Sequence, residues 1–256
     1  MLCLPQNEIH LWHANQAEFD GPELESNCLS WLTESETKRY HRYTYDYHRK
    51  QFLLGRMLIR NSLSKYAEIE PQDWKFEENE YGKPSIISSQ QAQPLFFNLS
   101  HSSERLVLAI SAHAGIGVDI ESSNKPRRVV KIADRYFSPT EAEELLALPE
   151  ADQLTRFYEL WTLKEAYIKA CGLGLAIPLR QFSYSFPSEY RVLINFAEGH
   201  NDDASLWQCW QIEVSGRSKM ALAVKSGNAA VDSIHSRRFL ALDEVMSMDT
   251  KILRDH

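Results

Sequence analysis

Four side chains that could do chemistry together lie in one predicted helix: Trp161, Lys164, Glu165 and Lys169. At about 100° per residue, all four fall within less than half of the helix circumference. The carboxylate could therefore hold a metal or accept a proton while the two ammonium groups hold phosphate. An ordinary surface ion pair is the alternative, because Glu165 precedes Lys169 by four residues, which is the favoured order. Taken alone, the helix favours the ordinary pair.

A second pair of carboxylates lies on the predicted strand 116–121. Val118 and Ile120 alternate there with Asp119 and Glu121, so the two carboxylates share one face at a spacing of about 7 Å. Both could converge on a hard cation such as magnesium. On its own, the pattern is explained better by a solvated edge strand.

Local signals predict the elements that position these residues. Apolar residues recur at helical spacing over 153–171, and Gly172 suits a left-handed C-terminal cap. A capping box at Thr33 opens a helical region that runs to residue 66, with a break near 43–47. A short helix is predicted over 129–136, and Ser138 with Pro139 predicts another helix start. Strands are predicted over 8–14, 95–100, 105–111, 116–121, 182–186, 190–196, 206–214 and 219–225. The strands between 95 and 121 are expected to form an antiparallel meander, and the tail suggests a short helix at 239–246.

Composition limits the classes of function. The chain has 256 residues, of which 43% are hydrophobic and 25% charged, which is enough for one large domain or two small ones. A net charge of −7 disfavours a nucleic-acid binder. The four cysteines are scattered, which argues against a zinc site or disulfide framework and fits a reducing cytosol. No apolar run approaches ~18 residues and no signal peptide is expected, so we predict a cytoplasmic protein with no membrane contact.

Five motifs occur in order along the chain: Gly82-Lys83-Pro84, Asn98-Leu99-Ser100-His101-Ser102, Gly117-Val118-Asp119-Ile120-Glu121, Phe137-Ser138 with Glu141, and Trp161 with Lys164-Glu165 and Lys169. Together they resemble the Sfp-type 4′-phosphopantetheinyl transferases over about residues 33–224. The resemblance implies an α+β fold of two similar halves related by a pseudo-twofold axis, with the active site between them. It also implies a monomer, since the trimeric holo-acyl-carrier synthase type has about half this length. We expect an N-terminal half at 1–115, a C-terminal half at 116–231 and a tail at 232–256.

The resemblance further implies a reaction. The enzyme would move the 4′-phosphopantetheine arm of coenzyme A onto a serine of an apo acyl or peptidyl carrier protein and release adenosine 3′,5′-bisphosphate. Asp119, Glu121 and Glu165 would be the magnesium ligands, and Glu165, or a water it holds, would take the serine proton. Lys164 and Lys169 would hold the diphosphate oxygens. The residues implied in catalysis are thus Glu165, Lys169 and Asp119.

The coenzyme A side follows from the same resemblance. Gly82, Lys83 and Pro84 would line the adenine, and Ser100 and His101 would contact the 3′-phosphate. A third group on that phosphate would come from the basic region 38–60, where Arg39 falls on a family basic position. Two other positions where the family usually has basic residues carry Glu36 and Gln51, and Arg49 or Lys50 could substitute for them. Trp161 is expected to pack rather than to react.

Two other classes of function stay open. A non-catalytic coenzyme A-binding or carrier-docking module of this fold would be marked by loss of a carboxylate, and Asp119, Glu121 and Glu165 are all present. A metal-dependent phosphodiesterase or nuclease would need a basic groove, which the net charge disfavours. The sequence does not identify the carrier protein.

Overall fold

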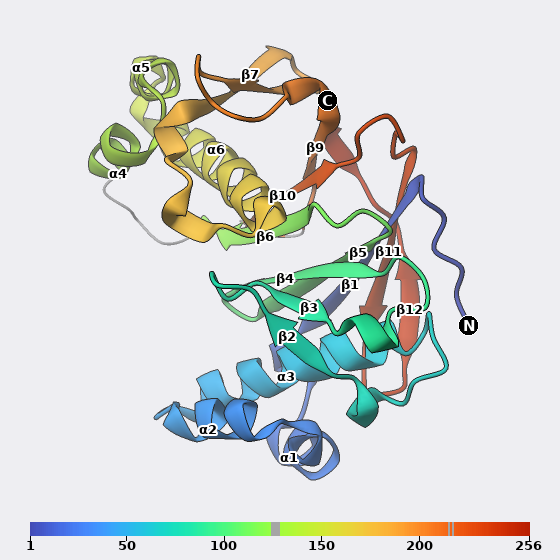
Figure 1. The fold of residues 1–256 in the computed structure, drawn as a ribbon. Coiled ribbons are helices and arrows are strands. Elements are labelled where there is room, and N and C mark those ends of the chain that lie inside the picture. The colour runs from blue at the N-terminus through green and yellow to red at the C-terminus, as the bar shows by residue number, and fades with distance from the viewer. Residues whose placement is uncertain (124–128, 215, 217) are drawn as a thin grey trace.

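The computed structural model describes residues 1–123, 129–214, 216 and 218–256, and it contains two larger β-sheets, each with a long helix on one face (Figure 1). The helices are α1 (Gly21–Cys28), α2 (Glu34–Arg42), α3 (Asp46–Leu63), α4 (Val129–Tyr136), α5 (Pro139–Ala147) and α6 (Glu150–Cys171). The first sheet has the order β12 (Val245–Met248), β11 (Ser233–Phe239), β1 (Glu8–Asn15), β5 (Arg105–Ser111) and β4 (Phe96–Ser102). The second has the order β13 (Ile252–Arg254), β9 (Trp207–Ile212), β10 (Ser218–Lys225) and β6 (Ile116–Ser122).

The same series of elements occurs twice along the chain. β1 is followed by three helices, the hairpin of β2 (Phe76–Glu78) and β3 (Pro84–Ile86), and then β4 and β5. In the described part of the chain, β6 is followed by three α-helices, the hairpin of β7 (Phe182–Ser188) and β8 (Arg191–Phe196), and then β9 and β10. The strand orders match as well, because β1-β5-β4 corresponds to β6-β10-β9. The chain is therefore built from two similar α+β halves, as the resemblance implied.

Strand alternation decides what each face of the sheets contacts. Ile9 and Leu11 of β1, together with Val118 and Ile120 of β6, belong to a core that lies between the two sheets. The opposite faces carry the helices, and each helix–sheet layer has a hydrophobic cluster of its own. β4 and β6 are edge strands of different sheets and lie side by side. We call this line of contact between β4 and β6 the seam.

The predicted helix starts, helix break and C-terminal cap are confirmed. Thr33 and Glu36 form a capping box at the start of α2, and Ser138 and Glu141 form another at α5. The chain leaves the helical conformation between Arg42 and Asp46, where the break is predicted. Gly172 ends α6 with a φ of 72°, in the left-handed region that glycine tolerates.

Two predictions are wrong, one of strand pairing and one of local structure in the tail. The meander does not form, because β1 and β4 occupy both edges of β5, and β6 pairs with β10 instead. The suggested helix at 239–246 does not form either, since the tail contains β11, which runs parallel to β1, and β12 beside it. None of the helices in the described residues is long and apolar enough to cross a membrane.

Candidate active site

Three of the predicted residues meet at the seam, each from a different element. Lys169 of α6 places its Nζ 2.6 Å from Oδ1 of Asp119 on β6. The same ammonium donates to Ser100 Oγ of β4 at 3.0 Å, and Ser100 donates to Asp119 Oδ1 at 2.9 Å. Asp119 is only 5% exposed, so these contacts are buried where the two halves meet. We call Ser100, Asp119, Glu121, Glu165 and Lys169 the seam site.

A glycine allows α6 to come this close to β6. An ideal Cβ on Gly117 would lie 2.1 Å from the carbonyl oxygen of Ala166 and 2.4 Å from the amide nitrogen of Ala170. Both are backbone atoms that no side-chain motion can remove, so the helix rests directly on the strand only because residue 117 has no side chain. Lys169 can then reach Asp119, and Glu165, one turn earlier on the same face, is half-buried beside the seam.

Asp119 has one oxygen available for a further partner. Its Oδ1 accepts from Ser100 and Lys169, whereas its buried Oδ2 has no hydrogen-bond partner within the described part of the chain. Glu121, two residues along β6, accepts a hydrogen bond from Ser102 at 3.2 Å. As these side chains lie, no three His, Cys, Asp or Glu residues of the described ranges converge into a metal-binding group. Even so, the unpartnered Oδ2 and an all-carboxylate donor set suit a hard cation.

A cationic group lies beside the seam site around His101. Burial lowers the pKa of His101, and the positive charges of Lys169, Arg39 and His48 lower it further, partly opposed by Asp119. Arg39, the predicted partner of His101, therefore lies close enough to act on it. The sequence analysis missed His48, which begins no motif and is surrounded by the rings of Tyr43, Tyr45 and Tyr47. The available signal was a basic residue in the first turn of α3, directly after the break that follows α2.

The two positions that depart from the family pattern have structural partners. Glu36 closes the α2 capping box and pairs with the buried Arg60 at 3.0 Å and with Arg56 at 3.4 Å. Gln51 donates to the carbonyl oxygen of Ser103 at 2.6 Å, and Ser103 is a non-glycine residue with a φ of 53°. Gln51 thus holds the β4–β5 turn next to His101, which is a supporting role rather than a phosphate contact.

Lys164 does not lie in the seam site, which corrects the expectation that it holds diphosphate. Its side chain is fully buried, with Nζ 2.8 Å from Glu141 Oε2. The ammonium also donates to the carbonyl oxygens of Leu179 and Phe182, at 2.8 and 2.6 Å. Burial lowers the pKa of Lys164, although the Glu141 carboxylate opposes that shift. The physical reason is that the predicted arc was too wide, and the step of about 100° from Glu165 to Lys164 turns Lys164 into the core.

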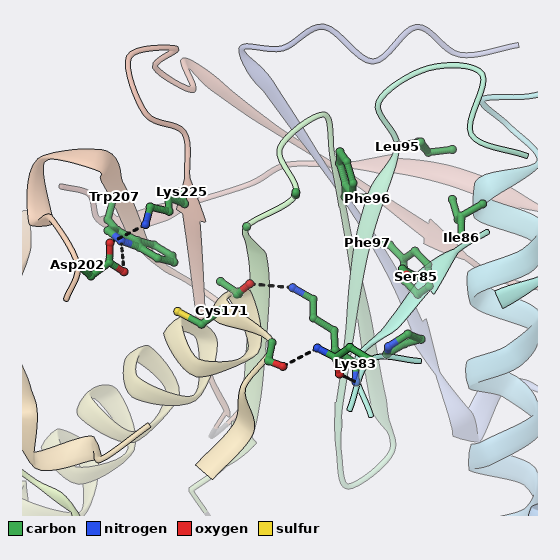
Figure 2. A pocket seen from close by; sticks show the side chains of 16 residues that line it. Lys83, Ser85, Ile86, Leu95, Phe96, Phe97, Cys171, Asp202, Trp207 and Lys225 are labelled. Atoms are coloured by element: carbon green, nitrogen blue, oxygen red, sulfur yellow. Dashed lines mark hydrogen bonds and ion pairs between the residues drawn. The ribbon is translucent and has the colours of Figure 1, made fainter. Parts of the chain in front are cut away.

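Lys83 and Trp161 both have structural contacts. Lys83, directly before β3, donates to the carbonyl oxygen of Ala170 on α6 at 2.8 Å (Figure 2). It also donates to the carbonyl oxygen of Ile116 on β6 at 3.2 Å. Burial lowers the pKa of Lys83 to about 8. Trp161 stacks on Phe157, with ring centroids 5.8 Å apart, which agrees with the packing role expected for it.

A cavity of about 510 Å³ lies next to Lys83 (Figure 2). Lys83 and Pro84 line it together with Phe96, Trp207 and others. The lining includes no residue of the seam site and neither His101 nor Gly82. This cavity beside the 82–84 turn is therefore separate from the carboxylates of the seam site.

Comparisons with known proteins agree with this arrangement of two halves. A family model described as the 4′-phosphopantetheinyl transferase superfamily matches residues 115–224, and one described as 4′-phosphopantetheinyl transferase, N-terminal, matches residues 11–113. The 4′-phosphopantetheinyl transferase HetI of Nostoc sp. is 35% identical over 176 residues, which is 68% of this chain and 73% of HetI. The 4′-phosphopantetheinyl transferase Sfp of Bacillus subtilis is 34% identical over 179 residues, which is 70% of this chain and 77% of Sfp. A solved structure of holo-[acyl-carrier-protein] synthase from Thermotoga maritima has a TM-score of 0.35 and 20% identity, over 44% of this chain and 62% of that one.

Proposed function

The chain belongs to the 4′-phosphopantetheinyl transferase superfamily, and we propose that the seam site is its catalytic centre, with magnesium held by Asp119, Glu121 and Glu165. The enzyme transfers the 4′-phosphopantetheine arm of coenzyme A to a serine of an apo carrier protein, giving the holo carrier and adenosine 3′,5′-bisphosphate. The observation that carries the site assignment is made on Asp119. One of its oxygens accepts from both Ser100 and Lys169, and the other is buried with no hydrogen-bond partner among the residues that the structure describes.

The reaction exchanges one phosphorus–oxygen bond for another. The carrier serine oxygen attacks the phosphorus that bears pantetheine, and the bond from that phosphorus to the bridging oxygen of the diphosphate breaks. The electron pair leaves with adenosine 3′,5′-bisphosphate. Bound magnesium would neutralise diphosphate charge as a Lewis acid. In-line displacement of this kind depends mainly on positioning and charge neutralisation.

The residues of this chain have distinct parts in that reaction. Glu165 accepts the proton of the serine hydroxyl, directly or through a water. Lys169, whose ammonium is held at the seam by Asp119 and Ser100, faces the developing charge of the diphosphate. His101 and Arg39 hold the 3′-phosphate, and the 82–84 turn lies on the adenine side.

We assign residues 1–115 to a half that holds the adenine and 3′-phosphate, 116–231 to a half that holds magnesium, and 232–256 to a tail. Since one chain supplies both halves of the site, we propose a monomer. The scattered cysteines support a cytoplasmic location.

Intact-mass analysis of a carrier protein tests the proposal. The protein is incubated with coenzyme A, magnesium and an apo carrier, with a serine-to-alanine carrier and an excess of EDTA as controls. We expect the apo carrier to gain the mass of one phosphopantetheine when magnesium is available. The serine-to-alanine carrier, and the apo carrier in excess EDTA, should gain none. Coenzyme A binding without any gain of mass would favour the non-catalytic module instead. Cleavage of coenzyme A with no carrier present would favour a phosphodiesterase.

A further inference from the structure

Three side chains of β4 connect it to β6 along the seam, where the two strands belong to different sheets. Asn98 Oδ1 accepts from the amide of Val118 at 2.9 Å. Ser100 Oγ accepts from the amide of Ile120 at 3.2 Å, and Ser102 Oγ accepts from the amide of Ser122 at 3.0 Å. These bonds occur at every second residue of both strands, so side chains of the first half satisfy the edge amides of the second half. We call these three bonds the seam ladder.

The two serines of the seam ladder also donate to the carboxylates of β6. Ser100 donates to Asp119 Oδ1 at 2.9 Å, and Ser102 donates to Glu121 Oε2 at 3.2 Å. A hydroxyl has a single proton, and each serine oxygen already accepts an amide N–H. The proton of each serine is therefore directed at a carboxylate.

The third position of the ladder supports this interpretation. Asn98 bonds the amide of Val118, and the preceding residue of β6 is Gly117, which has no side chain to position. Each serine of β4 thus lies opposite a carboxylate of β6. Asn98 of β4 lies opposite Gly117, where β6 has no carboxylate. Holding the sheets together would need only an acceptor, which asparagine supplies equally well. The serines add a donor where there is an acid to orient.

We propose that Ser102 is a positioning residue, which fixes the orientation of the Glu121 carboxylate for magnesium, as Ser100 does for Asp119. The proposal rests on the proposed function, because it takes Asp119 and Glu121 as metal ligands. Hydrogen bonds to the ligands of a metal restrict their orientation, and their loss typically costs about ten- to a hundredfold in metal affinity. Ser102 is the cleaner test, since Ser100 also contacts Lys169.

Calorimetric titration of magnesium into the protein saturated with coenzyme A, without carrier, tests this directly. We expect Ser102→Ala to weaken magnesium binding by about ten- to a hundredfold, and Ser102→Thr, which keeps the hydroxyl, to bind within about threefold of the parent. Ser122→Ala is the matched control on β6, because the ladder uses the amide of Ser122 and not its hydroxyl. With saturating magnesium, the Ser102→Ala turnover should return to near the parent value.

Three outcomes separate the possibilities. If the parent binds no magnesium, the metal assignment of the proposed function fails, and this inference fails with it. If the parent binds magnesium and Ser102→Ala binds it equally well, the positioning role alone is overturned. If Ser102→Ala and Ser122→Ala weaken binding equally, or if excess magnesium does not restore turnover, Ser102 has only a packing role. Thermal unfolding of each variant shows whether it is folded at the titration temperature.

Discussion

The two halves share one topology but use equivalent strand faces differently. On β1, the face toward the helices carries Trp12 and His10, which are buried and both contact the Tyr66 hydroxyl, at 3.0 and 2.6 Å. On β6, the corresponding face carries Gly117, Asp119 and Glu121. The first half fills that space with an aromatic core and the second leaves it polar at the seam. The same strand position thus serves core packing on β1 and carries the candidate site on β6, and only a few side chains make this difference.

The glycines of the two halves show the same difference. Gly55 lies on α3, and a Cβ there would meet only side-chain ends, with Leu99 Cδ2 at 3.2 Å and Leu106 Cδ2 at 3.6 Å. Gly117 lies on the strand, and a Cβ there would meet the backbone of α6. A layer of side chains separates helix from strand in the first half, whereas backbone touches backbone in the second. Close approach of helix to strand is thus a property of the second half, which supplies Asp119, Glu121, Glu165 and Lys169 to the seam site.

The largest effect is expected from removing the carboxylate that distinguishes β6 from β1. Asp119→Ala should lower transfer by at least about a thousandfold, because a catalytic metal supplies several kcal/mol and Asp119 would be one of its ligands. The fold should persist, since Val118 and Ile120 face the core between the sheets and Asp119 does not. Carrier modification is followed by mass spectrometry and folding by circular dichroism. Full activity in the variant would remove Asp119 from the site.

The glycine contrast predicts unequal losses of stability. Gly117→Ala should lower the free energy of unfolding by about 3 kcal/mol or more, because the added methyl meets fixed backbone atoms. Gly55→Ala should change it by no more than about 1 kcal/mol, since the gain in helix propensity offsets a small shift of leucine side chains. Urea unfolding measures both. Equal effects would mean that α6 is not held closer to its sheet than α3.

Glu165 and Glu159 both lie on α6, and we expect the first to act in catalysis and the second to stabilise the fold. Glu165→Gln should lower turnover by at least about 100-fold, the usual contribution of acid–base help. Glu159 pairs with Lys219, Arg156 and Arg254 at 3.1, 3.4 and 3.5 Å. Glu159→Gln should therefore lower the unfolding midpoint and leave turnover within a few-fold. Steady-state kinetics and thermal unfolding are compared for both variants, and equal mild losses of turnover would place the catalytic face elsewhere on the helix.

The smallest effect is expected in the first half, which we assign to binding. A charged hydrogen bond to phosphate is worth about ten- to a hundredfold in affinity, so the parent should prefer coenzyme A over dephospho-coenzyme A by at least that much. His101→Ala and Arg39→Ala should each reduce the preference, because the lost contact is with the group that dephospho-coenzyme A lacks. The affinity ratio of the two ligands is the measurement.

Lys38→Ala is the control for that ratio, since Lys38 is on the same helix as Arg39 and pairs with Glu34 at the surface. Arg60 is less suitable, because it is fully buried against Glu36 and its loss would disturb the fold. An unchanged ratio in both His101→Ala and Arg39→Ala would shift the assignment to Arg49 and Lys50.

The features that could be predicted from the sequence are those set by residues close together in the chain. The capping boxes at Thr33 and Ser138 and the cap at Gly172 depend on residues within a few positions of each other, and all three were predictable. The partners of β6 and β11 depend on residues far along the chain, which local patterns do not specify. The position of Lys164 also depends on tertiary contacts that local spacing does not specify. Spacing placed it beside Glu165, but only tertiary packing reveals Glu141 as its partner and the core as its surroundings.

One signal in the sequence could have been used further. A glycine inside a predicted strand often marks a close backbone approach. Gly117, two residues before Asp119 on the same face of the strand, could have predicted that a helix rests on that strand. Ser102 could not have been found in this way, because its role depends on two sheets meeting at their edges.

The pairing of β11 with β1 has a consequence for synthesis of the protein. Ile9 aligns with Ile234, so one edge of β1 stays unpaired until residues 233–239 have left the ribosome. The nascent chain must carry an exposed strand edge throughout translation of the second half, and such edges favour aggregation. Contacts of this sequence separation also slow folding. The first half would therefore benefit from a chaperone during translation, although its long helix and other strands are made early.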